Sequence, residues 1–135
     1  MTAKQEAEEL MNDLLPFAKK MLADYGEFFP FGGYTKPTGD IVHVGAKSGD
    51  RETHKSADLA TVLEQSLLER AQGGECKATA IVFNVTIRRG DAIQVNVDHK
   101  AGYSAQVFIP YTFDGNAVVY GEVFAQEGDH RIFGN

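Results

Sequence analysis

Apolar side chains recur at intervals of three and four residues at the start of the chain, which is the period of an amphipathic helix. The apolar positions are Ala7, Leu10, Met11, Leu14, Ala18, Met21, Leu22 and Tyr25. The pattern predicts a helix over residues 2–25. Pro16 lacks an N–H and clashes with the preceding turn, so we expect a kink near residues 12–15 or a restart of the helix there. Gly26 suits the left-handed residue that ends many helices.

Two short apolar segments follow and are separated by a turn. The segments are FFPFGGYT, residues 28–35, and DIVHVGA, residues 40–46. The intervening KPTG contains proline and glycine, so the sequence predicts a β-hairpin. The first segment has more aromatic side chains than one face of a short strand needs: Phe28, Phe29, Phe31 and Tyr34. We expect these rings in the core, because a central strand covered on both faces has this pattern; outward-facing rings are the alternative.

A second helix is predicted after residue 55, where helical spacing returns. Ser56 suits the N-cap position, Asp58 lies in the first turn, and Gly73 and Gly74 end the helix. Its apolar positions are Leu59, Val62, Leu63 and Leu67. The alternation then has period two and predicts strands at 81–87, 93–97, 105–111 and 118–125. The turns between them are too short for crossover connections, so these strands form an antiparallel meander.

Together these elements predict an α+β protein: a kinked N-terminal helix, a β-hairpin, a second helix and a four-stranded antiparallel meander. All six strands are expected in one mostly antiparallel sheet. Hairpin, helix and meander in this order resemble the profilin-like and roadblock-like group of domains, in which the first strand lies mid-sheet beside the last. With the strands numbered along the chain, that resemblance implies the order 2-1-6-5-4-3.

The tripeptide Tyr-Gly-Glu occurs twice, at residues 25–27 and 120–122. The two copies are not structural repeats, because the first ends a predicted helix and the second lies inside a predicted strand. The order 2-1-6-5-4-3 would place the start of the first strand beside the end of the last. It therefore predicts that Glu27 and Glu122 lie in the same neighbourhood.

Six segments together resemble a family of small bacterial proteins whose function is uncharacterised. The segments are YGEFFPFGG, GDIVHVGA, DAIQV, VFIPY, YGEVFA and RIF. The resemblance extends from about Leu22 to Phe133 and includes no recognised catalytic signature. It implies a bacterial origin and a one-domain protein, and it implies no activity.

Composition and charge indicate which classes of protein the chain can belong to. The chain has 135 residues, which favours a single domain over residues 1–135. Cys76 is its single cysteine, so no intrachain disulfide forms, and with an acidic N-terminal segment this predicts a cytoplasmic protein. No apolar run approaches the roughly 18 residues of a membrane span. The net charge of -6 argues against a nucleic-acid partner, which would require a basic surface.

The sequence contains no coherent catalytic or metal-binding set. His43, His54, His99 and His130 lack the spacing to another His or Cys that zinc sites have, so no metal or cofactor is predicted. Cys76 follows a helix end instead of a helix N-terminus and lacks the setting of a nucleophile. Gly32 and Gly33, inside a strand, make no phosphate-binding motif and indicate a bulge or a close approach of another backbone.

Two surfaces are candidates for function. The meander has a regular face of amides and hydroxyls, little charged, that predicts contact with another protein or a second copy of the chain; an ordinary solvated sheet face is the simpler alternative. The interaction-face residues are Asn84, Gln94, Asn96, Asp98 and Gln106. A pocket between the first hairpin and the helices is the second surface, with polar residues Glu27, Tyr34, His43 and Glu122.

These surfaces lead to two hypotheses about function. The first is a non-enzymatic interaction or regulatory module, with an immunity-type protein that neutralises a basic toxin as a variant suited to a small acidic chain. The second is a small-molecule-binding protein or enzyme that uses the hairpin pocket. The absence of a catalytic set favours the first hypothesis.

Overall fold

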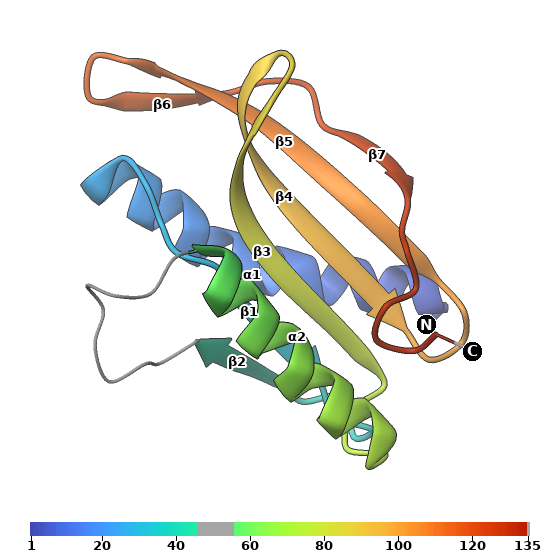
Figure 1. Cartoon of the computed structure of the whole chain (residues 1–135). Helices are drawn as coiled ribbons and strands as arrows, with labels where there is room; N and C mark the ends of the chain where they lie inside the picture. Colours follow the sequence, from blue (N-terminus) through green and yellow to red (C-terminus); the bar gives the residue numbers. More distant parts are fainter. Residues whose placement is uncertain (46–55, 135) are drawn as a thin grey trace.

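The computed structural model describes residues 1–45 and 56–134, which form two helices and seven strands (Figure 1). The elements are α1 (Ala3–Tyr25), β1 (Phe31–Thr35), β2 (Ile41–Gly45), α2 (Ser56–Gln72), β3 (Ala78–Ile87), β4 (Gly90–His99), β5 (Ser104–Asp114), β6 (Ala117–Tyr120) and β7 (Phe124–Glu127). The seven strands form one antiparallel sheet, which confirms the predicted α+β class. The predicted strand at 118–125 is divided into β6 and β7.

Helix α1 is defined by caps at both ends. Thr2 and Gln5 form a capping box, in which the Gln5 N–H donates to the Thr2 hydroxyl at 3.1 Å and the Thr2 N–H donates to the Gln5 side chain at 2.9 Å. At the other end Gly26 has φ 75°, the predicted left-handed conformation. The helix continues through Pro16, so the predicted restart does not occur. Pro16 is exposed, and the buried leucines on the other side of the helix hold both halves on the sheet. Neither described helix combines the length and apolarity that a bilayer crossing requires.

The order of the strands differs from the prediction. It is β2-β1-β3-β4-β5-β6, with β7 also paired to β5. Strand β1 therefore pairs with β3, the first strand of the meander, and does not pair with the last. α2 packs on β1 and β3, so the chain leaving this helix enters the sheet at the neighbouring position, where the Lys77 N–H donates to the Thr35 carbonyl at 2.8 Å. The observed order follows the general preference of consecutive elements for adjacent positions. The order implied by the resemblance to profilin-like domains is wrong for this chain.

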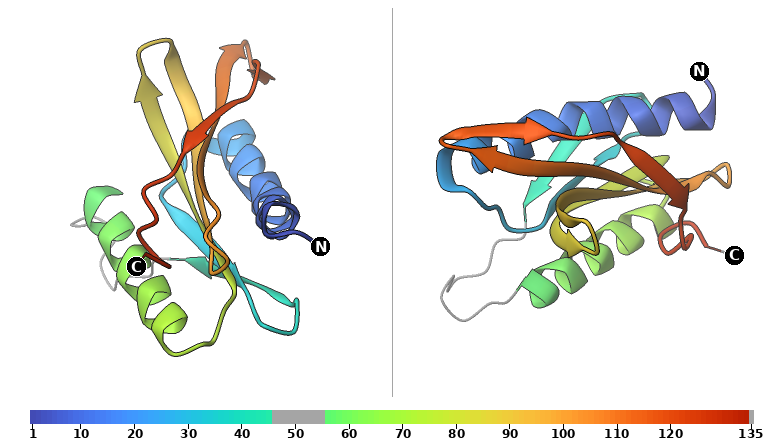
Figure 2. Two further views of the ribbon diagram at one scale, coloured as in Figure 1. Left: turned by 90° about the vertical axis from the view of Figure 1, so that its right-hand side faces the viewer. Right: turned by 90° about the horizontal axis from the view of Figure 1, so that it is seen from above.

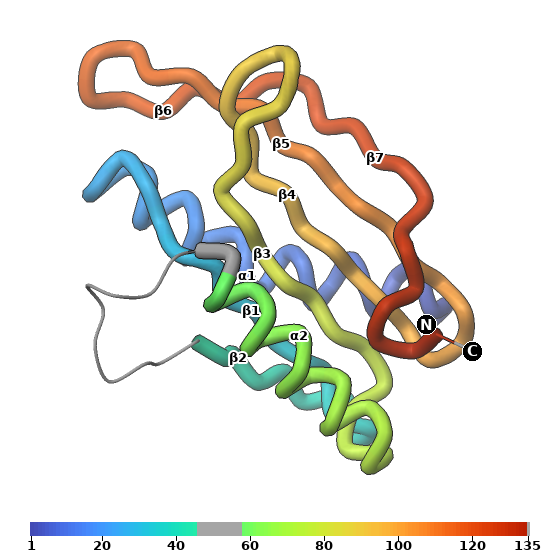
Figure 3. Tube along the Cα trace, in the orientation of Figure 1, coloured from blue at the N-terminus to red at the C-terminus, as the bar shows by residue number. Residues whose placement is uncertain are grey.

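Strands β6 and β7 are separate because β5 contains a proline. β6 pairs with residues 111–114 of β5 and β7 pairs with residues 105–108. Pro110 lies between these stretches and has no N–H to donate. At this position the Gly121 N–H donates a hydrogen bond to the Pro110 carbonyl at 2.8 Å. Figure 3 shows the chain leaving β6 and continuing past β5 before β7 begins. Glu122 thus lies between β6 and β7, whereas the sequence analysis predicted it inside a strand.

One helix lies on each face of the sheet (Figure 2), and a hydrophobic cluster lies beneath each of them. α1 covers one face, where its leucines pack on alternate residues of β3, β4 and β5. α2 covers part of the other face, over β1 and β3, together with Ile132 near the C-terminus. Phe28, Phe31 and Tyr34 are buried as predicted, whereas Phe29 is 56% exposed. The aromatic segment is therefore mainly a core element, because β1 has a helix on each side.

Candidate functional site

Four of the predicted interaction-face residues share the sheet face opposite α1. Gln94, Asn96 and Asp98 alternate along β4, and the register places Gln106 of β5 directly beside Asn96. The intervening Val95 belongs to the core beneath α1. Since successive residues of a strand point to opposite faces, the four polar side chains lie on the face away from α1.

Asn84 does not share this face, contrary to the sequence prediction. Asn84 lies opposite Ile93 in the sheet, and it accepts a hydrogen bond of 2.5 Å from the Tyr111 hydroxyl. Ile93 and Tyr111 both belong to the core beneath α1. The residue opposite Gln94 is Phe83. Because β3 is buried on both faces from Ala80 to Val82, alternation of polarity alone did not assign its side chains to the correct face.

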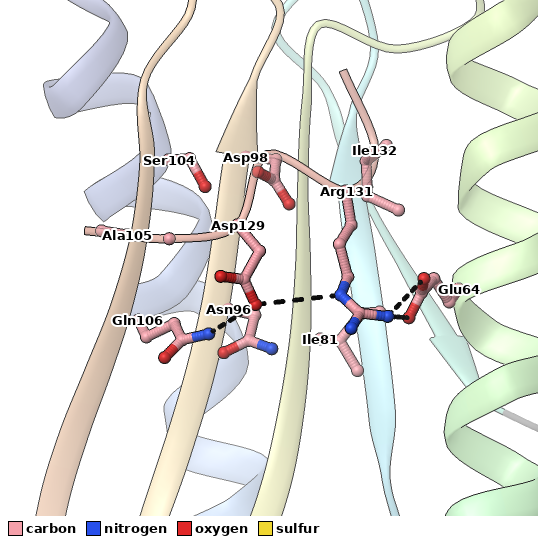
Figure 4. A pocket seen from close by; sticks show the side chains of 11 residues that line it. Glu64, Ile81, Asn96, Asp98, Ser104, Ala105, Gln106, Asp129, Arg131 and Ile132 are labelled. Carbon is pink, nitrogen blue, oxygen red and sulfur yellow. Dashed lines mark hydrogen bonds and ion pairs between the residues drawn. The ribbon is translucent and has the colours of Figure 1, made fainter. Parts of the chain in front are cut away.

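A small cavity lies where this face meets α2 and the C-terminal segment, residues 128–134 (Figure 4). Its polar walls are Glu64 of α2, Asn96 and Asp98 of β4, Ser104 and Gln106 of β5, and Asp129 and Arg131 of the C-terminal segment. The volume of about 20 Å³ is enough for roughly one water-sized group. The cavity is far smaller than the sites, of roughly 300 Å³ or more, that enclose metabolites.

Asp98 is the one buried carboxyl group in the described part of the chain, with 6% of its surface exposed. Burial raises the pKa of Asp98 above its ordinary value, and a hydrogen bond from the Ser104 side chain and the charge of His130 act in the opposite direction. One carboxyl oxygen, Oδ1, has no hydrogen-bond partner among the described residues. A buried carboxyl group with a raised pKa in a concave site is a candidate for function.

The C-terminal segment is held against β5 through Ser104. The Gly128 N–H donates to the Ser104 carbonyl at 3.1 Å, and the His130 N–H donates to the Ser104 hydroxyl oxygen at 3.2 Å. A Cβ atom at Gly128 would overlap that hydroxyl and lie 2.8 Å from the Ala105 nitrogen, so glycine is required for this close approach. Ile132 is buried against the core beneath α2. The segment is therefore a packed wall of the cavity.

Arg131 is bound by carboxylates other than Asp98. Its Nη1 lies 3.2 Å and 3.5 Å from the two carboxylate oxygens of Glu64, and its Nε lies 3.9 Å from Asp129. Figure 4 shows the guanidinium group directed toward Glu64 and away from Asp98. The cation in the cavity wall thus leaves the free oxygen of Asp98 without a donor.

The four residues of the predicted hairpin pocket are not brought together by the sheet. β3, β4 and β5 separate β1 from β6, which removes the reason for expecting Glu27 near Glu122. Tyr34 is buried and its hydroxyl accepts a hydrogen bond of 3.2 Å from Arg70, whereas His43 is exposed and lies 2.6 Å from Asp13 of α1. Tyr34 lies opposite Val42, so the side chains of Tyr34 and His43 point to opposite faces. None of the four lines the cavity beside Asp98.

A second charged cluster, around the buried His99, was not anticipated from the sequence. His99 is 5% exposed, and its Nε2 lies 3.0 Å from Glu6 in the first turns of α1. The Ala101 N–H donates to His99 Nδ1 at 3.0 Å, which places the ring proton on Nε2, where it can be donated to Glu6. Lys77 forms an ion pair with the other oxygen of Glu6, and these interactions lower the pKa of Glu6. This cluster ties α1 to β4 and to the residue that precedes β3.

The charged residues of the cavity that the sequence analysis missed are Glu64, Asp129 and Arg131. Glu64 lies on the polar side of an ordinary amphipathic helix, and the other two follow a glycine near the C-terminus. No spacing or motif connects them, because they meet only when α2 and the C-terminal segment pack on the sheet. Among residues 1–45 and 56–134, no group of three or more His, Cys, Asp or Glu side chains could hold a metal ion. His54 lies outside the described residues.

Cys76 should be unreactive in the folded protein. It is buried, and desolvation raises the pKa of its thiol, so little thiolate is present at neutral pH. We expect labelling by a small thiol reagent at pH 7 to be at least about tenfold slower for the native protein than for protein unfolded in urea. Equal rates in the two states would show that Cys76 is accessible and that the core beneath α2 is open.

Comparison of the chain with protein-family models, with curated proteins and with solved structures finds no significant match.

Proposed function

We propose that the chain is a non-enzymatic protein-interaction module that binds a basic segment of another protein on the part of the sheet that no helix covers. The observation that carries this proposal is the incomplete second layer. α1 covers its own face, but α2 packs on β1 and β3 (Figures 1 and 2). The face of β4, β5 and β7 opposite α1 is covered by the C-terminal segment at one end only, and neither described helix packs on it.

The chemistry of this surface suits a protein partner. We define the open face as Gln94, Asn96, Asp98, Gln106, Phe108 and Phe124, which the registers of β4, β5 and β7 place on one side of the sheet. At one end the rings of Phe108 and Phe124 are stacked with centroids 5.0 Å apart, and Arg89 lies over the ring of Phe124. Amides occupy the middle, and the cavity beside Asp98 lies at the other end. Aromatic rings and uncharged amides surrounded by polar groups are typical of interfaces.

Charge and size indicate the kind of partner. The chain has a net charge of -6, and Asp98, Asp129 and Glu64 gather at the cavity, so a basic segment is electrostatically complementary. A second copy of the chain would bring the same carboxylates against one another. Gln94 and Asp98 are four residues apart on β4, about 13 Å. An extended segment with an apolar and a basic side chain about four positions apart would reach both ends of the open face.

An immunity-type role, in which the chain neutralises a basic toxin, is one form of this function. Small size and acidity are suitable for such a protein, and binding to the open face would be its mechanism. The proposal requires no catalytic step.

Removal of the exposed ring at the apolar end of the open face should weaken partner binding. Phe124 is 37% exposed, and Phe124→Ala deletes the ring while the backbone pairing of β7 with β5 is kept. Phe113→Ala is a matched control, because Phe113 is 47% exposed on β5, the strand that pairs with β7, but points to the side of α1. We expect the wild type and Phe113→Ala to retain a basic protein from a lysate of the cells that produce this chain. The same protein should bind about tenfold more weakly to Phe124→Ala.

The measurement is affinity capture followed by binding assays with the purified partner. Equal binding by both variants would place the contact elsewhere and contradict the proposal. Light scattering tests whether the chain forms a dimer instead. If the wild type and Phe113→Ala are dimers and Phe124→Ala is a monomer, a second copy of the chain occupies the open face, which also contradicts the proposal of a basic partner.

A further inference from the structure

We infer that the cavity beside Asp98 is a binding site for a primary ammonium group, supplied by a lysine side chain of the partner. The inference rests on the proposed function and specifies which group of the partner enters the cavity. Three observations support it: a buried acceptor without a donor, the size of the cavity, and the charge of its walls.

The acceptor is the carboxyl group of Asp98, which lines the cavity and whose Oδ1 has no hydrogen-bond partner among the described residues. A buried carboxyl oxygen without a hydrogen bond is costly, and such groups are rare unless a ligand or water completes them. The neighbouring donors are engaged elsewhere: the His130 N–H donates to the Ser104 hydroxyl oxygen, and Arg131 is bound to Glu64. Thr79, directly opposite Asp98 on β3, is also buried with an unpartnered hydroxyl. Two adjacent polar groups thus lack partners at the same end of the sheet.

The size of the cavity selects the head group. A volume of about 20 Å³ holds roughly one water-sized group, which an ammonium matches and a guanidinium exceeds. An ammonium has three N–H donors and no acceptor, so it can donate to Asp98 and to further oxygens of the walls. Ile81, Ala105 and Ile132 also line the cavity and offer apolar contact to the methylene groups of a lysine.

The charge of the walls selects a cation. Three carboxyl groups, those of Glu64, Asp98 and Asp129, line the cavity together with a single guanidinium, that of Arg131. Arg131 neutralises Glu64 at 3.2 Å and lies farther from Asp129, at 3.9 Å. An incoming ammonium would complete the charge balance and would form a charge-assisted hydrogen bond with Asp98.

Titration of the purified protein with methylammonium chloride tests the site directly. We expect saturable shifts of the backbone amide resonances of Asp98, Ser104 and Gly128 in two-dimensional NMR spectra. Tetramethylammonium chloride at equal ionic strength is the control, because this cation has no N–H donor and exceeds the cavity. No saturable shifts, or equal shifts with both cations, would overturn the inference.

Variants assign the shifts to the cavity. Asp98→Asn preserves the shape of the side chain and should weaken methylammonium binding at least about tenfold, whereas Glu127→Gln, an exposed carboxyl group on β7, should have no effect. Gln106→Lys places an ammonium in the cavity wall and should also block the site, which provides a second, independent variant. Unchanged binding in either folded variant would contradict the inference.

The partner assay separates this inference from the proposed function. A partner whose binding is weakened by Phe124→Ala and also by Asp98→Asn supports both, and substitution of the partner's lysine should have the same effect. A partner weakened by Phe124→Ala alone would retain the proposed function and reject the lysine anchor. Saturable methylammonium binding without any partner for the open face would identify a site for a free amine and reject the proposed function.

Discussion

Gly32→Ala should lower the free energy of unfolding by about 3 kcal/mol or prevent folding. A Cβ atom at Gly32 would lie 2.5 Å from the Ala80 carbonyl oxygen and 3.5 Å from the Ile81 Cα. Both atoms belong to the backbone of β3, so the overlap is relieved only if β1 moves away from β3. That movement would break central sheet pairing and open the core on both sides. The measurement is urea denaturation followed by circular dichroism.

Gly45→Ala is the matched control for this prediction. Gly45 lies on β2, the next strand, where an added Cβ atom would have no atom of the described residues within 4 Å apart from its neighbours in the chain. Its substitution should change the free energy of unfolding by no more than about 0.5 kcal/mol. If Gly32→Ala proves as stable as the wild type, β1 cannot pair with β3 in the register described. The experiment thus tests the difference between the observed strand order and the order 2-1-6-5-4-3.

The elements of this fold could be predicted from local patterns, because their causes are local. The three- and four-residue spacing of leucines in α1 and the period of two after Ile81 depend only on residues near one another in the chain. The two adjacent glycines of β1 correctly indicated a close approach of another backbone. They could not indicate which backbone, because Ala80 is reached only after the whole of α2 has been placed.

The candidate site could be predicted in part. The alternation of Gln94, Asn96 and Asp98 identified one polar face of β4, since a strand fixes the relation between its own residues. It could not place Asn84, which depends on the register between β3 and β4. Nor could it show that Asp98 is buried, because the residues that cover it come from α2 and from the C-terminal segment. A polar residue on a strand gives no local sign of whether distant segments will enclose it.

Asp98 and Glu6 illustrate how two carboxyl groups of one sheet acquire opposite properties. Asp98 is enclosed on the open face with one oxygen unpartnered, and its pKa is raised mainly by burial. Glu6 lies on the other side of the sheet, where hydrogen bonds from Lys77 and then His99 lower its pKa. A raised pKa means that the folded state disfavours the carboxylate, and a lowered pKa means that it favours it. Asp98 therefore costs stability at neutral pH, whereas Glu6 contributes to it.

Glu6→Gln should lower the free energy of unfolding at pH 7 by about 2 kcal/mol, because Lys77 and the buried His99 lose their anionic partner. The pKa of Glu6 is lower in the folded state than its ordinary value of 4.5, so its contribution is complete above that value and is lost as the pH falls through the folded pKa. The difference between wild type and variant should accordingly shrink below about pH 4.5. Urea denaturation at a series of pH values measures it.

Asp98→Asn provides the comparison of opposite sign for Glu6→Gln. The raised pKa of Asp98 means that the wild type regains stability as the pH falls from the folded pKa toward the ordinary value of 3.8, when the carboxyl group becomes protonated in the folded state first. The asparagine variant should therefore be at least as stable as the wild type at pH 7 and lose that advantage in acid. The quantity compared is the difference in free energy of unfolding between each variant and the wild type. If this difference changes with pH in the same direction for both variants, or is constant with pH for Glu6→Gln, the two faces of the sheet do not have opposite electrostatic environments.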